Sequence, residues 1–492
     1  MNDWMRDLAE HYAAARSRHP WDDLMIVFDI DGTILDMRHM VWHVLLEYDR
    51  AHRSEFFYGL CVEDVDVHEN QLEPMLLRLG LQEDVRRDVL HWYLERRWTS
   101  AAILASHRPY QGVMDIIRWF QLQPRTFVGL NTGRPDAIRR DTLESLNALG
   151  REYRVRFEDE LLLMNPLAWE QGVQDGKARN LQLFREHGFR VVAVVDNEPS
   201  NLASMAQADT AGEILFLHAE TLFESVRREI PRTVVGSSYD ITGLVREEDV
   251  PRHVQLVWQG VDDRASLDAF LASTIHWGAC GLRRDLLGRI VVRRDSFADR
   301  AWRREEQGLL FDACLPRFAH AEKSMELELE SVELLDEVLM SVTRFDPRQL
   351  CFDGTLERLG QSGFERIARA VPGAVVQCPV DFLCPMLLGA PAQAREVLEM
   401  LRRWGVTRFS LSWKQPSLRR AFELLGAWGY EVNLRDVPDL AGFLQAALLL
   451  PRSLSATFDF PQWRERAETS LAFPARELAH DEHDPEWTRV SG

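Results

Sequence analysis

Three short apolar runs of this sequence end in side chains that could do chemistry. The first run ends at Asp29 and Asp31, the second at Thr132, and the third at Asp196. Such runs, partly β-branched, are typical of buried parallel strands. Because an unpaired charge inside a core is costly, we expect these carboxylates to face a metal ion, a substrate or water. A solvated turn is the alternative for Asp29 and Asp31 taken alone.

The types and order of these residues suit the transfer of a phosphoryl group. Asp29 could attack phosphorus as a nucleophile and form an aspartyl-phosphate. Asp31, two residues later on the same strand end, could protonate the leaving oxygen and then activate water. The hydroxyl of Thr132, the backbone N–H of Gly133 and the ammonium of Lys177, which we expect to open a helix, would neutralise the phosphoryl oxygens.

Asp196 adds an oxygen ligand of the kind that Mg²⁺ prefers. The four motifs, in this order across residues 22–222, resemble the haloacid dehalogenase superfamily. The resemblance implies a phosphatase with Asp29 as nucleophile and Asp31 as general acid and base. It also implies that Mg²⁺ is held by the carboxylates of Asp29 and Asp196 and by the backbone carbonyl of Asp31. The expected substrate-binding residues are Gly32, Thr33, Thr132, Gly133, Arg134 and Lys177.

One position departs from the pattern of that family. A second acid usually follows the last aspartate by four or five residues, and here those positions are Ser200 and Asn201. Asn201 could still orient a water bound to the metal, and Glu198 lies nearby in the sequence. The departure therefore predicts weaker metal binding with the main ligands retained.

Residues 37–115 differ in character from the segments around them. Apolar stripes at helical spacing, around residues 40–48 and 85–94, predict an insertion of two to four helices with its loop at residues 63–70. The insertion resembles the helical cap of phosphoglycolate-phosphatase-type members, which implies closure over the site and a small phosphate ester as substrate. Arg38, His39, Tyr110 and Arg134 could line its mouth, or could simply be solvated.

Strands and helices alternate on either side of this insertion. The alternation predicts an α/β unit with a doubly wound parallel sheet. Its strands are expected at residues 24–28, 126–130, 161–164, 191–195 and 213–217, with helices that include residues 3–16 and 177–187. The predicted unit spans residues 1–230 and is followed by a linker at residues 231–250.

A second alternation, of eight strands with helices, occupies residues 251–465 and predicts a (β/α)₈ barrel of the TIM type. The strands are expected at residues 254–258, 276–282, 325–329, 349–353, 374–380, 408–413, 430–436 and 453–459, and the helices at residues 266–273, 332–343, 357–370, 392–404, 416–428 and 439–447. The stretches 256–260, 285–295, 325–328, 432–433 and 457–461 resemble glycerophosphodiester phosphodiesterases. That family has its acid/base histidines and two metal carboxylates where this chain has Gln259, Ala279, Gly281 and Arg294. Glu328 alone matches a metal ligand, so the resemblance implies a non-catalytic barrel.

The barrel could nevertheless bind a phosphodiester, or it could serve as a scaffold. The side chains that would hold such a ligand are Arg283, Arg284, Arg293, Arg294 and Lys414. The arginines at 283–284 and 293–294 could equally form a solvated face. The acidic residues 466–492 are typical of a solvated tail.

Composition narrows the class of protein further. The chain has 492 residues, of which 46% are apolar and 27% charged, and this suits a soluble protein of two or three domains. A net charge of −19 argues against nucleic acid as a partner. No apolar run is long enough to predict a membrane span. The six scattered cysteines are typical of thiols in a reducing cytoplasm.

The sequence thus predicts a cytoplasmic, Mg²⁺-dependent phosphohydrolase that acts on a small phosphorylated metabolite, alone or as a homo-oligomer. The alternative is a non-catalytic or regulatory protein whose barrel binds a phosphodiester, a lipid head group or a protein partner. Phosphotransfer to an acceptor other than water is a third possibility.

Overall fold

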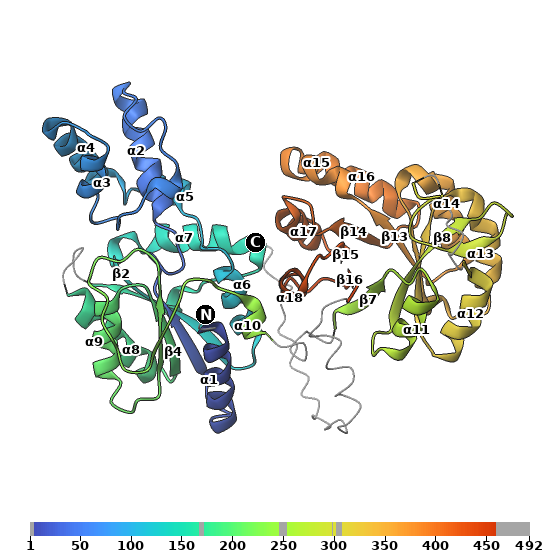
Figure 1. Ribbon diagram of the computed structural model, residues 1–492, viewed down its shortest axis with the longest axis horizontal. Helices are drawn as coiled ribbons and strands as arrows, with labels where there is room; N and C mark the ends of the chain where they lie inside the picture. The colour runs from blue at the N-terminus through green and yellow to red at the C-terminus, as the bar shows by residue number, and fades with distance from the viewer. Residues whose placement is uncertain (1–3, 167–171, 246–252, 298, 302–307, 459–492) are drawn as a thin grey trace.

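The structure is a computed structural model, and it describes residues 4–166, 172–245, 253–297, 299–301 and 308–458. Two α/β units lie side by side along the long axis of the molecule (Figure 1). The fold class predicted from the sequence, a doubly wound sheet with a helical cap followed by a closed barrel, is confirmed. The predicted acidic tail at residues 466–492 lies outside the described residues.

The first unit is built on six parallel strands in the order β3-β2-β1-β4-β5-β6. The chain runs outward from β1 in both directions, so the crevice beside β1 is where open α/β sheets bind ligands. The sheet continues past the boundary placed at residue 230, because β6 pairs with β5. The strands are β1 (Leu24–Phe28), β2 (Thr126–Pro135), β3 (Leu162–Asn165), β4 (Arg190–Asp196), β5 (Leu215–Ala219) and β6 (Thr233–Gly236).

Helices cover both faces of this sheet because alternate residues of β1 point to opposite sides. Leu24, Ile26 and Phe28 belong to the core that α1 and α6 help to form. Met25 and Val27 belong to a separate core with α8 and α9. The helices of the unit are α1 (Trp4–Arg18), α6 (Val113–Leu122), α7 (Arg139–Gly150), α8 (Val173–Glu186), α9 (Pro199–Ala208) and α10 (Ile241–Leu244).

The helical cap follows β1 and projects from one end of the unit (Figure 1). It contains the four helices α2 (Arg38–His52), α3 (Glu73–Arg78), α4 (Glu83–Arg96) and α5 (Ser100–Ser106). Residues 65–72, within and just beyond the predicted loop, connect α2 and its short 3₁₀ turn to α3 without regular structure. The end of the predicted insertion extends into α6, which packs on β2 in the body of the unit.

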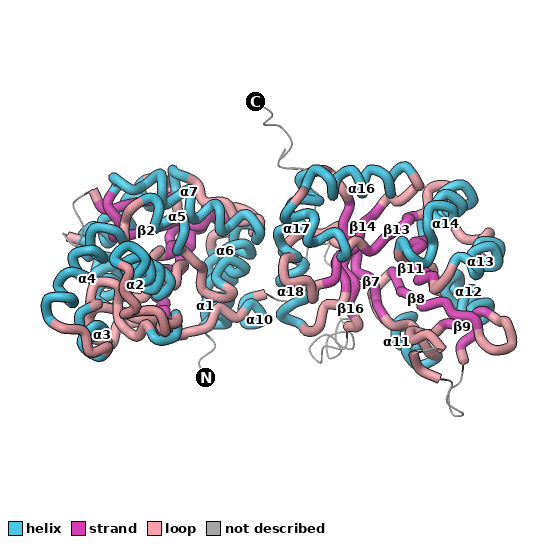
Figure 2. The backbone as a smooth tube through the Cα atoms, turned by 90° about the horizontal axis from the view of Figure 1, so that it is seen from above, coloured by secondary structure: helices cyan, strands magenta, loops and turns pink. Residues whose placement is uncertain are grey.

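The second unit is a closed barrel of eight parallel strands, in which β7 pairs with both β8 and β16 (Figure 2). All eight strands lie within a few residues of the predicted positions. They are β7 (Gln255–Gln259), β8 (Trp277–Arg284), β11 (Ser324–Leu329), β12 (Leu350–Asp353), β13 (Val375–Pro379), β14 (Arg408–Ser412), β15 (Glu431–Arg435) and β16 (Ser453–Ala456).

The barrel also carries elements that the sequence did not predict. Strands β9 (Ile290–Val292) and β10 (Leu309–Leu310) extend the sheet from β8 in antiparallel fashion. Helices α12 and α15 are additional as well. The helices of the unit are α11 (Arg264–Ala272), α12 (Phe311–His320), α13 (Leu335–Ser341), α14 (Leu356–Ala370), α15 (Cys384–Gly389), α16 (Pro391–Arg403), α17 (Leu418–Ala427) and α18 (Leu440–Leu448).

The two units are joined through α18, which packs against α6 and α10. The buried carboxylate of Asp115 in α6 pairs with Arg419 in α17 at 3.0 Å, and Arg118 donates to the carbonyl of Leu448 at 3.2 Å. In the described part of the chain, no helix combines the length and the apolar character that crossing a membrane requires.

Candidate active site

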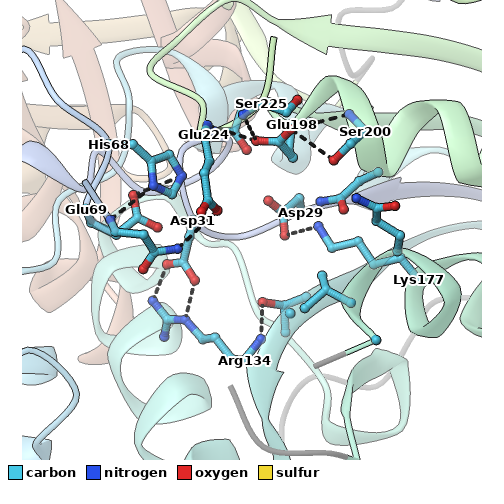
Figure 3. A pocket seen from close by; sticks show the side chains of 18 of the residues that line it. Asp29, Asp31, His68, Glu69, Arg134, Lys177, Glu198, Ser200, Glu224 and Ser225 are labelled. Carbon is cyan, nitrogen blue, oxygen red and sulfur yellow. Dashed lines mark hydrogen bonds and ion pairs between the residues drawn. The ribbon is translucent and has the colours of Figure 1, made fainter. Parts of the chain in front are cut away.

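A cavity of about 750 Å³ lies at the carboxyl end of β1, between the body of the first unit and its cap (Figure 3). Its lining combines residues from strand ends, from α8 and α9 and from two loops. The lining residues are Asp29, Asp31, His68, Glu69, Asn70, Trp98, Thr132, Gly133, Arg134, Gly172, Val173, Gln174, Asp175, Lys177, Asn197, Glu198, Ser200, Asn201, Glu224 and Ser225.

Lys177 joins the two buried carboxylates of Asp29 and Asp196 at the floor of this site. Its ammonium lies 2.7 Å from Asp29 Oδ1 and 2.6 Å from Asp196 Oδ2. The backbone N–H of Asp29 donates to the carbonyl of Val195 at 2.9 Å, which aligns the ends of β1 and β4. The α8 helix begins at Val173, so Lys177 lies in its second turn and does not open the helix as the sequence suggested.

The charges around Lys177 shift the pKa values of the group. Burial, opposed by Lys177 and reinforced by Asp196 and Asp31, raises the pKa of Asp29 to about 8. Although burial acts in the opposite direction, Asp196 and Asp29 raise the pKa of Lys177. Lys177 is therefore a fixed positive charge, and the ionisation of Asp29 depends on the positive charge beside it.

Asp31 is held in a bidentate ion pair with Arg134. Arg134 Nη2 donates to Asp31 Oδ1 at 2.6 Å and Nε donates to Oδ2 at 2.8 Å. The arginine is fully buried and also donates to Thr142 Oγ1 at 3.1 Å, and its Nη2 lies 3.2 Å from His107 Nε2. Although burial opposes it, Arg134 lowers the pKa of Asp31. In this arrangement Asp31 is a carboxylate without a proton to give.

The end of β2 brings Thr132 and Gly133 to the cavity wall, as predicted. Thr132 Oγ1 accepts the backbone N–H of Arg134 at 3.2 Å. The neighbouring Asn131 donates to the carbonyl of Lys177 at 3.0 Å and accepts from Asn180 at 2.9 Å. Asn131 thereby ties β2 to the turn of α8 that carries Lys177, and it acts as a positioning residue that the sequence did not single out.

Gly32 and Thr33, predicted to bind substrate, do not line the cavity. Gly32 has a φ of +75°, and a Cβ atom there would lie 2.2 Å from Asn197 Nδ2, so the turn requires glycine. Its carbonyl accepts from Thr221 Oγ1 at 2.6 Å. Thr33 is completely buried, and its carbonyl accepts from Tyr239 at 2.9 Å. Both residues shape the turn that carries Asp31.

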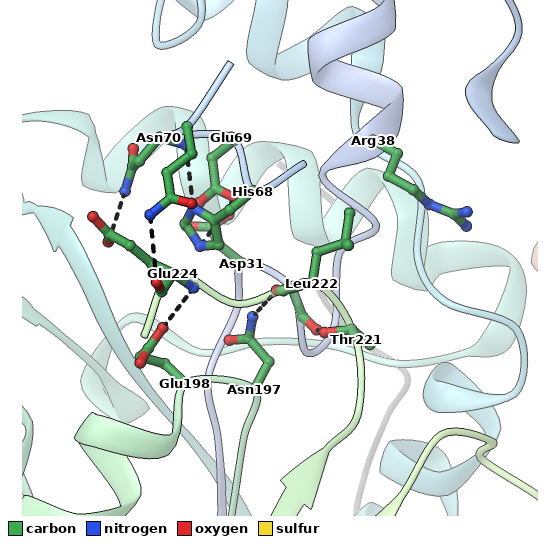
Figure 4. A network of polar contacts seen from close by, with 12 residues as sticks. Asp31, Arg38, His68, Glu69, Asn70, Asn197, Glu198, Thr221, Leu222 and Glu224 are labelled. Carbon is green, nitrogen blue, oxygen red and sulfur yellow. Dashed lines mark hydrogen bonds and ion pairs between the residues drawn. The ribbon is translucent and has the colours of Figure 1, made fainter. Parts of the chain in front are cut away.

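The expected mouth residues from the cap are also placed elsewhere. Arg38 forms a bidentate pair with Asp36, in which Nη2 lies 2.6 Å from Oδ2, and it lies apart from the cavity (Figure 4). His39 lies 4.0 Å from the same carboxylate. Neither residue, nor Tyr110, lines the cavity; Arg134 does.

Residues that sequence reasoning missed come from two loops that meet over the cavity (Figure 4). His68, Glu69 and Asn70 belong to the cap loop, and Glu224 follows β5. Asn70 Nδ2 donates to Glu224 Oε2 at 3.5 Å, and Glu198 Oε2 accepts the backbone N–H of Glu224 at 2.9 Å. The polar run at residues 63–70 indicated a loop, but nothing in it indicated that the loop would reach the site.

The donor atoms at the floor suit a magnesium ion. Asp29 and Asp196 converge on the ammonium of Lys177, and when both are ionised their two negative charges exceed its single positive charge, which leaves a divalent cation compatible with the charge balance. Mg²⁺ is often held by one or two carboxylates together with water and substrate oxygens. Among the described residues no group of three His, Cys, Asp or Glu side chains forms a metal site. The Mg²⁺ expectation therefore rests on these two carboxylates and the carbonyl of Asp31.

The carboxyl ends of the barrel strands carry more acids than the sequence suggested. Burial and Glu328 raise the pKa of Asp353 to about 7, and they also raise that of Asp262 to about 7. Glu328 is therefore not alone. Arg283 and Arg293 are buried, and each donates to backbone carbonyl oxygens, whereas Arg284 and Arg294 are exposed and Arg284 pairs with Glu337 at 3.0 Å. The four arginines therefore do not form a single solvated face, and phosphodiester binding by these residues and Lys414 stays a prediction.

Comparisons with known proteins bear on the fold. No protein-family model and no curated protein matches this chain. Solved structures of both expected classes resemble it. A glycerophosphodiester phosphodiesterase from Parabacteroides distasonis is 11% identical over 44% of this chain and 98% of its own, with a TM-score of 0.33. An Oleispira antarctica phosphodiesterase, in complex with the product sn-glycerol-3-phosphate, is 13% identical over 45% and 98%, with a TM-score of 0.33.

A protein from Burkholderia xenovorans described as a haloacid dehalogenase-like hydrolase is 17% identical over 41% of this chain and 83% of its own, with a TM-score of 0.24. The two resemblances expected from the motifs are therefore both found among solved structures. At these identities and TM-scores they carry no inference about activity. The class of protein is defined by its own geometry: a capped, doubly wound α/β unit with a carboxylate–lysine site, followed by a (β/α)₈ barrel.

Proposed function

We propose that the first unit is a phosphohydrolase that cleaves a small organic phosphate monoester through an aspartyl-phosphate on Asp29, with Mg²⁺ as cofactor. The observation that carries the proposal is the buried contact of Lys177 with Asp29 and Asp196 beneath a capped cavity. A lysine fixed beside a strand-end carboxylate supplies positive charge where a phosphoryl group would meet its nucleophile.

The first half of the reaction forms a bond between a carboxylate oxygen of Asp29 and phosphorus, and it breaks the bond from phosphorus to the leaving oxygen. The ammonium of Lys177, with Thr132 and the N–H of Gly133, would receive the negative charge of the phosphoryl oxygens. Once its pair with Arg134 has opened and Asp31 has taken a proton from solvent, Asp31 gives that proton to the leaving oxygen, which departs as an alcohol.

In the second half, Asp31 takes a proton from water, and the water oxygen attacks phosphorus. The bond to Asp29 breaks, and inorganic phosphate and the free carboxylate result. Because Asp31 is paired with Arg134 in this structure, both of its proton transfers require that pair to open. Trp98 of the cap packs on Arg134, with 5.0 Å between the guanidinium carbon and the centroid of the indole ring. Movement of the cap would therefore be the natural means of opening the pair.

A magnesium ion would be held by Asp29, Asp196 and the carbonyl of Asp31. When bound, it supplies positive charge that favours the ionised form of Asp29 and offsets the charge of the phosphate. Ser200 and Asn201, at the positions of the missing second acid, line the cavity, and Asn201 Nδ2 lies 3.5 Å from Asp196 Oδ1. Asn201 can therefore orient Asp196 in place of an additional carboxylate.

The test is a panel of phosphate esters with Mg²⁺, including p-nitrophenyl phosphate, run with the wild-type protein and Asp29→Asn. We expect the variant to lose at least about 10³-fold in turnover, the scale of losing a nucleophile, and to keep the fold. Asp136→Asn, an exposed carboxylate paired with Arg139, is the matched control. Turnover by Asp29→Asn at the wild-type rate would contradict the proposal. Release of alcohol in excess of phosphate would instead indicate transfer to another acceptor.

A further inference from the structure

The part of the cavity away from Lys177 is strongly acidic. Six of the described residues that line the whole cavity are Asp or Glu, and three of them, Asp31, Glu69 and Glu224, lie at this end; the lining cations among the described residues are only Arg134 and Lys177. Both of these cations are engaged with Asp31 or with Asp29 and Asp196. Figure 3 shows His68 and Glu69 on the side of the cavity opposite Lys177, with Glu224 above Asp31. This end would receive the leaving group of a phosphate ester.

The raised pKa of Glu69 indicates an excess of negative charge at this end of the cavity. Its carboxyl is buried, and burial together with Asp31 and Glu224 raises its pKa to about 8. Its close partner is His68, whose Nε2 lies 3.3 Å from Glu69 Oε2. Burial lowers the pKa of His68, so this imidazole is neutral near pH 7. A positive group placed here would stabilise carboxylates that now raise one another's pKa.

The guanidinium of Arg97 in the cap offsets this charge only in part, because it lowers the pKa of Glu69 and that pKa is nevertheless raised. Arg97 donates to the carbonyl of Glu69 at 3.0 Å and to Asn70 Oδ1 at 2.6 Å, so it braces the backbone of the cap loop. It does not line the cavity. A carboxylate on the substrate would therefore lie beside Asp31, Glu69 and Glu224 without a free cation among the described lining residues, and it would raise the pKa of Glu69 further, whereas an ammonium would lower that pKa and favour the ionised form.

We propose that the site selects phosphate monoesters whose leaving group carries an ammonium, which Glu69 and Glu224 receive while the phosphoryl group lies at Lys177. This inference rests on the proposed function of the site, since it assumes that the phosphoryl group lies at Asp29. A cavity of about 750 Å³ accommodates a small amino alcohol or amino sugar phosphate with room for water.

The experiment compares three esters of one length that differ in the terminal group: phosphoethanolamine, 2-hydroxyethyl phosphate and phosphoglycolate. Binding to the full chain is measured by calorimetry with Mg²⁺, in the Asp29→Asn background, so that no ester turns over. We expect phosphoethanolamine to bind at least about tenfold more tightly than the hydroxyl ester, equal to about 1.4 kcal/mol, and phosphoglycolate to bind most weakly.

Variants assign the preference to the two glutamates. Glu69→Gln and Glu224→Gln should each reduce the ratio of the two affinities, and together they should abolish it; Glu224→Lys should favour phosphoglycolate. Glu73→Gln, an exposed acid of α3 outside the cavity, is the matched control and should keep the ratio. Equal affinities for the three esters, absence of binding, or a preference that survives the double variant would overturn the inference.

The two proposals fail separately in this design. A wild-type protein that hydrolyses the hydroxyl and carboxylate esters as well as the ammonium ester would contradict the selectivity and leave the phosphohydrolase in place. A wild-type protein that binds phosphoethanolamine selectively but releases no phosphate from any ester would contradict the hydrolase and leave the selectivity in place.

Discussion

Replacement of Arg134 by methionine tests the central electrostatic feature of the site. The guanidinium is fully buried and makes two charge-assisted bonds to Asp31, at 2.6 and 2.8 Å, besides its bond to Thr142. Arg134→Met leaves the Asp31 carboxylate, whose side chain is only 16% exposed, without its cation, and breaking a buried pair from one side costs up to about 3–5 kcal/mol. For a unit of this size, such a loss corresponds to a melting temperature lower by roughly 6–20 °C.

The assay is scanning calorimetry of the full chain at pH 8. The melting temperature is compared for the unfolding transition that responds to the substitution. At that pH His107, whose pKa burial and Arg134 lower to about 3, stays neutral and does not substitute for the guanidinium. The double variant Arg134→Met/Asp31→Asn should regain most of the lost stability, because the penalty comes from the unpaired charge. A single variant within about 2 °C of the wild type, less than about 1 kcal/mol, would refute this reasoning. A double variant no more stable than the single one would do so as well.

Three further predictions concern the floor of the site. Lys177→Met should lower turnover by at least about 10³-fold and should also lower the melting temperature. Mg²⁺ should restore part of the lost stability, because the metal replaces the missing positive charge between Asp29 and Asp196. A melting temperature unchanged by the substitution would contradict this prediction. EDTA should abolish phosphate release. Added Mg²⁺ should raise the melting temperature of the wild type but not that of the double variant Asp29→Asn/Asp196→Asn. Equal stabilisation of both proteins would place the metal elsewhere. The pKa of Asp29 is raised to about 8 from an ordinary 3.8, so the native state retains a proton that the unfolded state has lost. In EDTA the free energy of unfolding should therefore fall as the pH rises from about 4 to about 8. Denaturation at several pH values should show a shallower fall for Asp29→Asn.

The regular elements were predictable where one physical signal dominated. Strand β1 is fully buried on both faces, so its sequence is an uninterrupted apolar run that ends sharply at Asp29. The barrel strands follow the same rule. The short strands β6, β9 and β10 have only two to four residues, and their pairing depends on a neighbouring strand already in place, so periodicity does not reveal them.

The candidate site was predictable mainly in its strand-end residues. Asp29, Asp31 and Thr132 meet because the carboxyl ends of parallel strands share one edge of the sheet, and Lys177 reaches them from α8. The roles of their partners were not visible, since the fold brings Arg134 to Asp31 from 103 residues away. Glu69 and Glu224 lie on loops whose position depends on the cap and on β5, and the sequence contains no pattern that joins them.

The strand ends of the barrel contrast with those of the first unit. Burial raises the pKa of Glu328, and Arg283, Arg294 and Arg435 oppose that rise. Arginine side chains thus provide, near Glu328, the positive charge that a divalent cation would provide in a metal-dependent barrel. In the first unit, by contrast, the positive charge is a lysine in direct contact with both carboxylates, 2.7 Å from Asp29 and 2.6 Å from Asp196. Because phosphoryl transfer is promoted by positive charge fixed next to the nucleophile, the difference between the two sites supports the expectation that Asp29, and not the barrel, carries the chemistry of this chain.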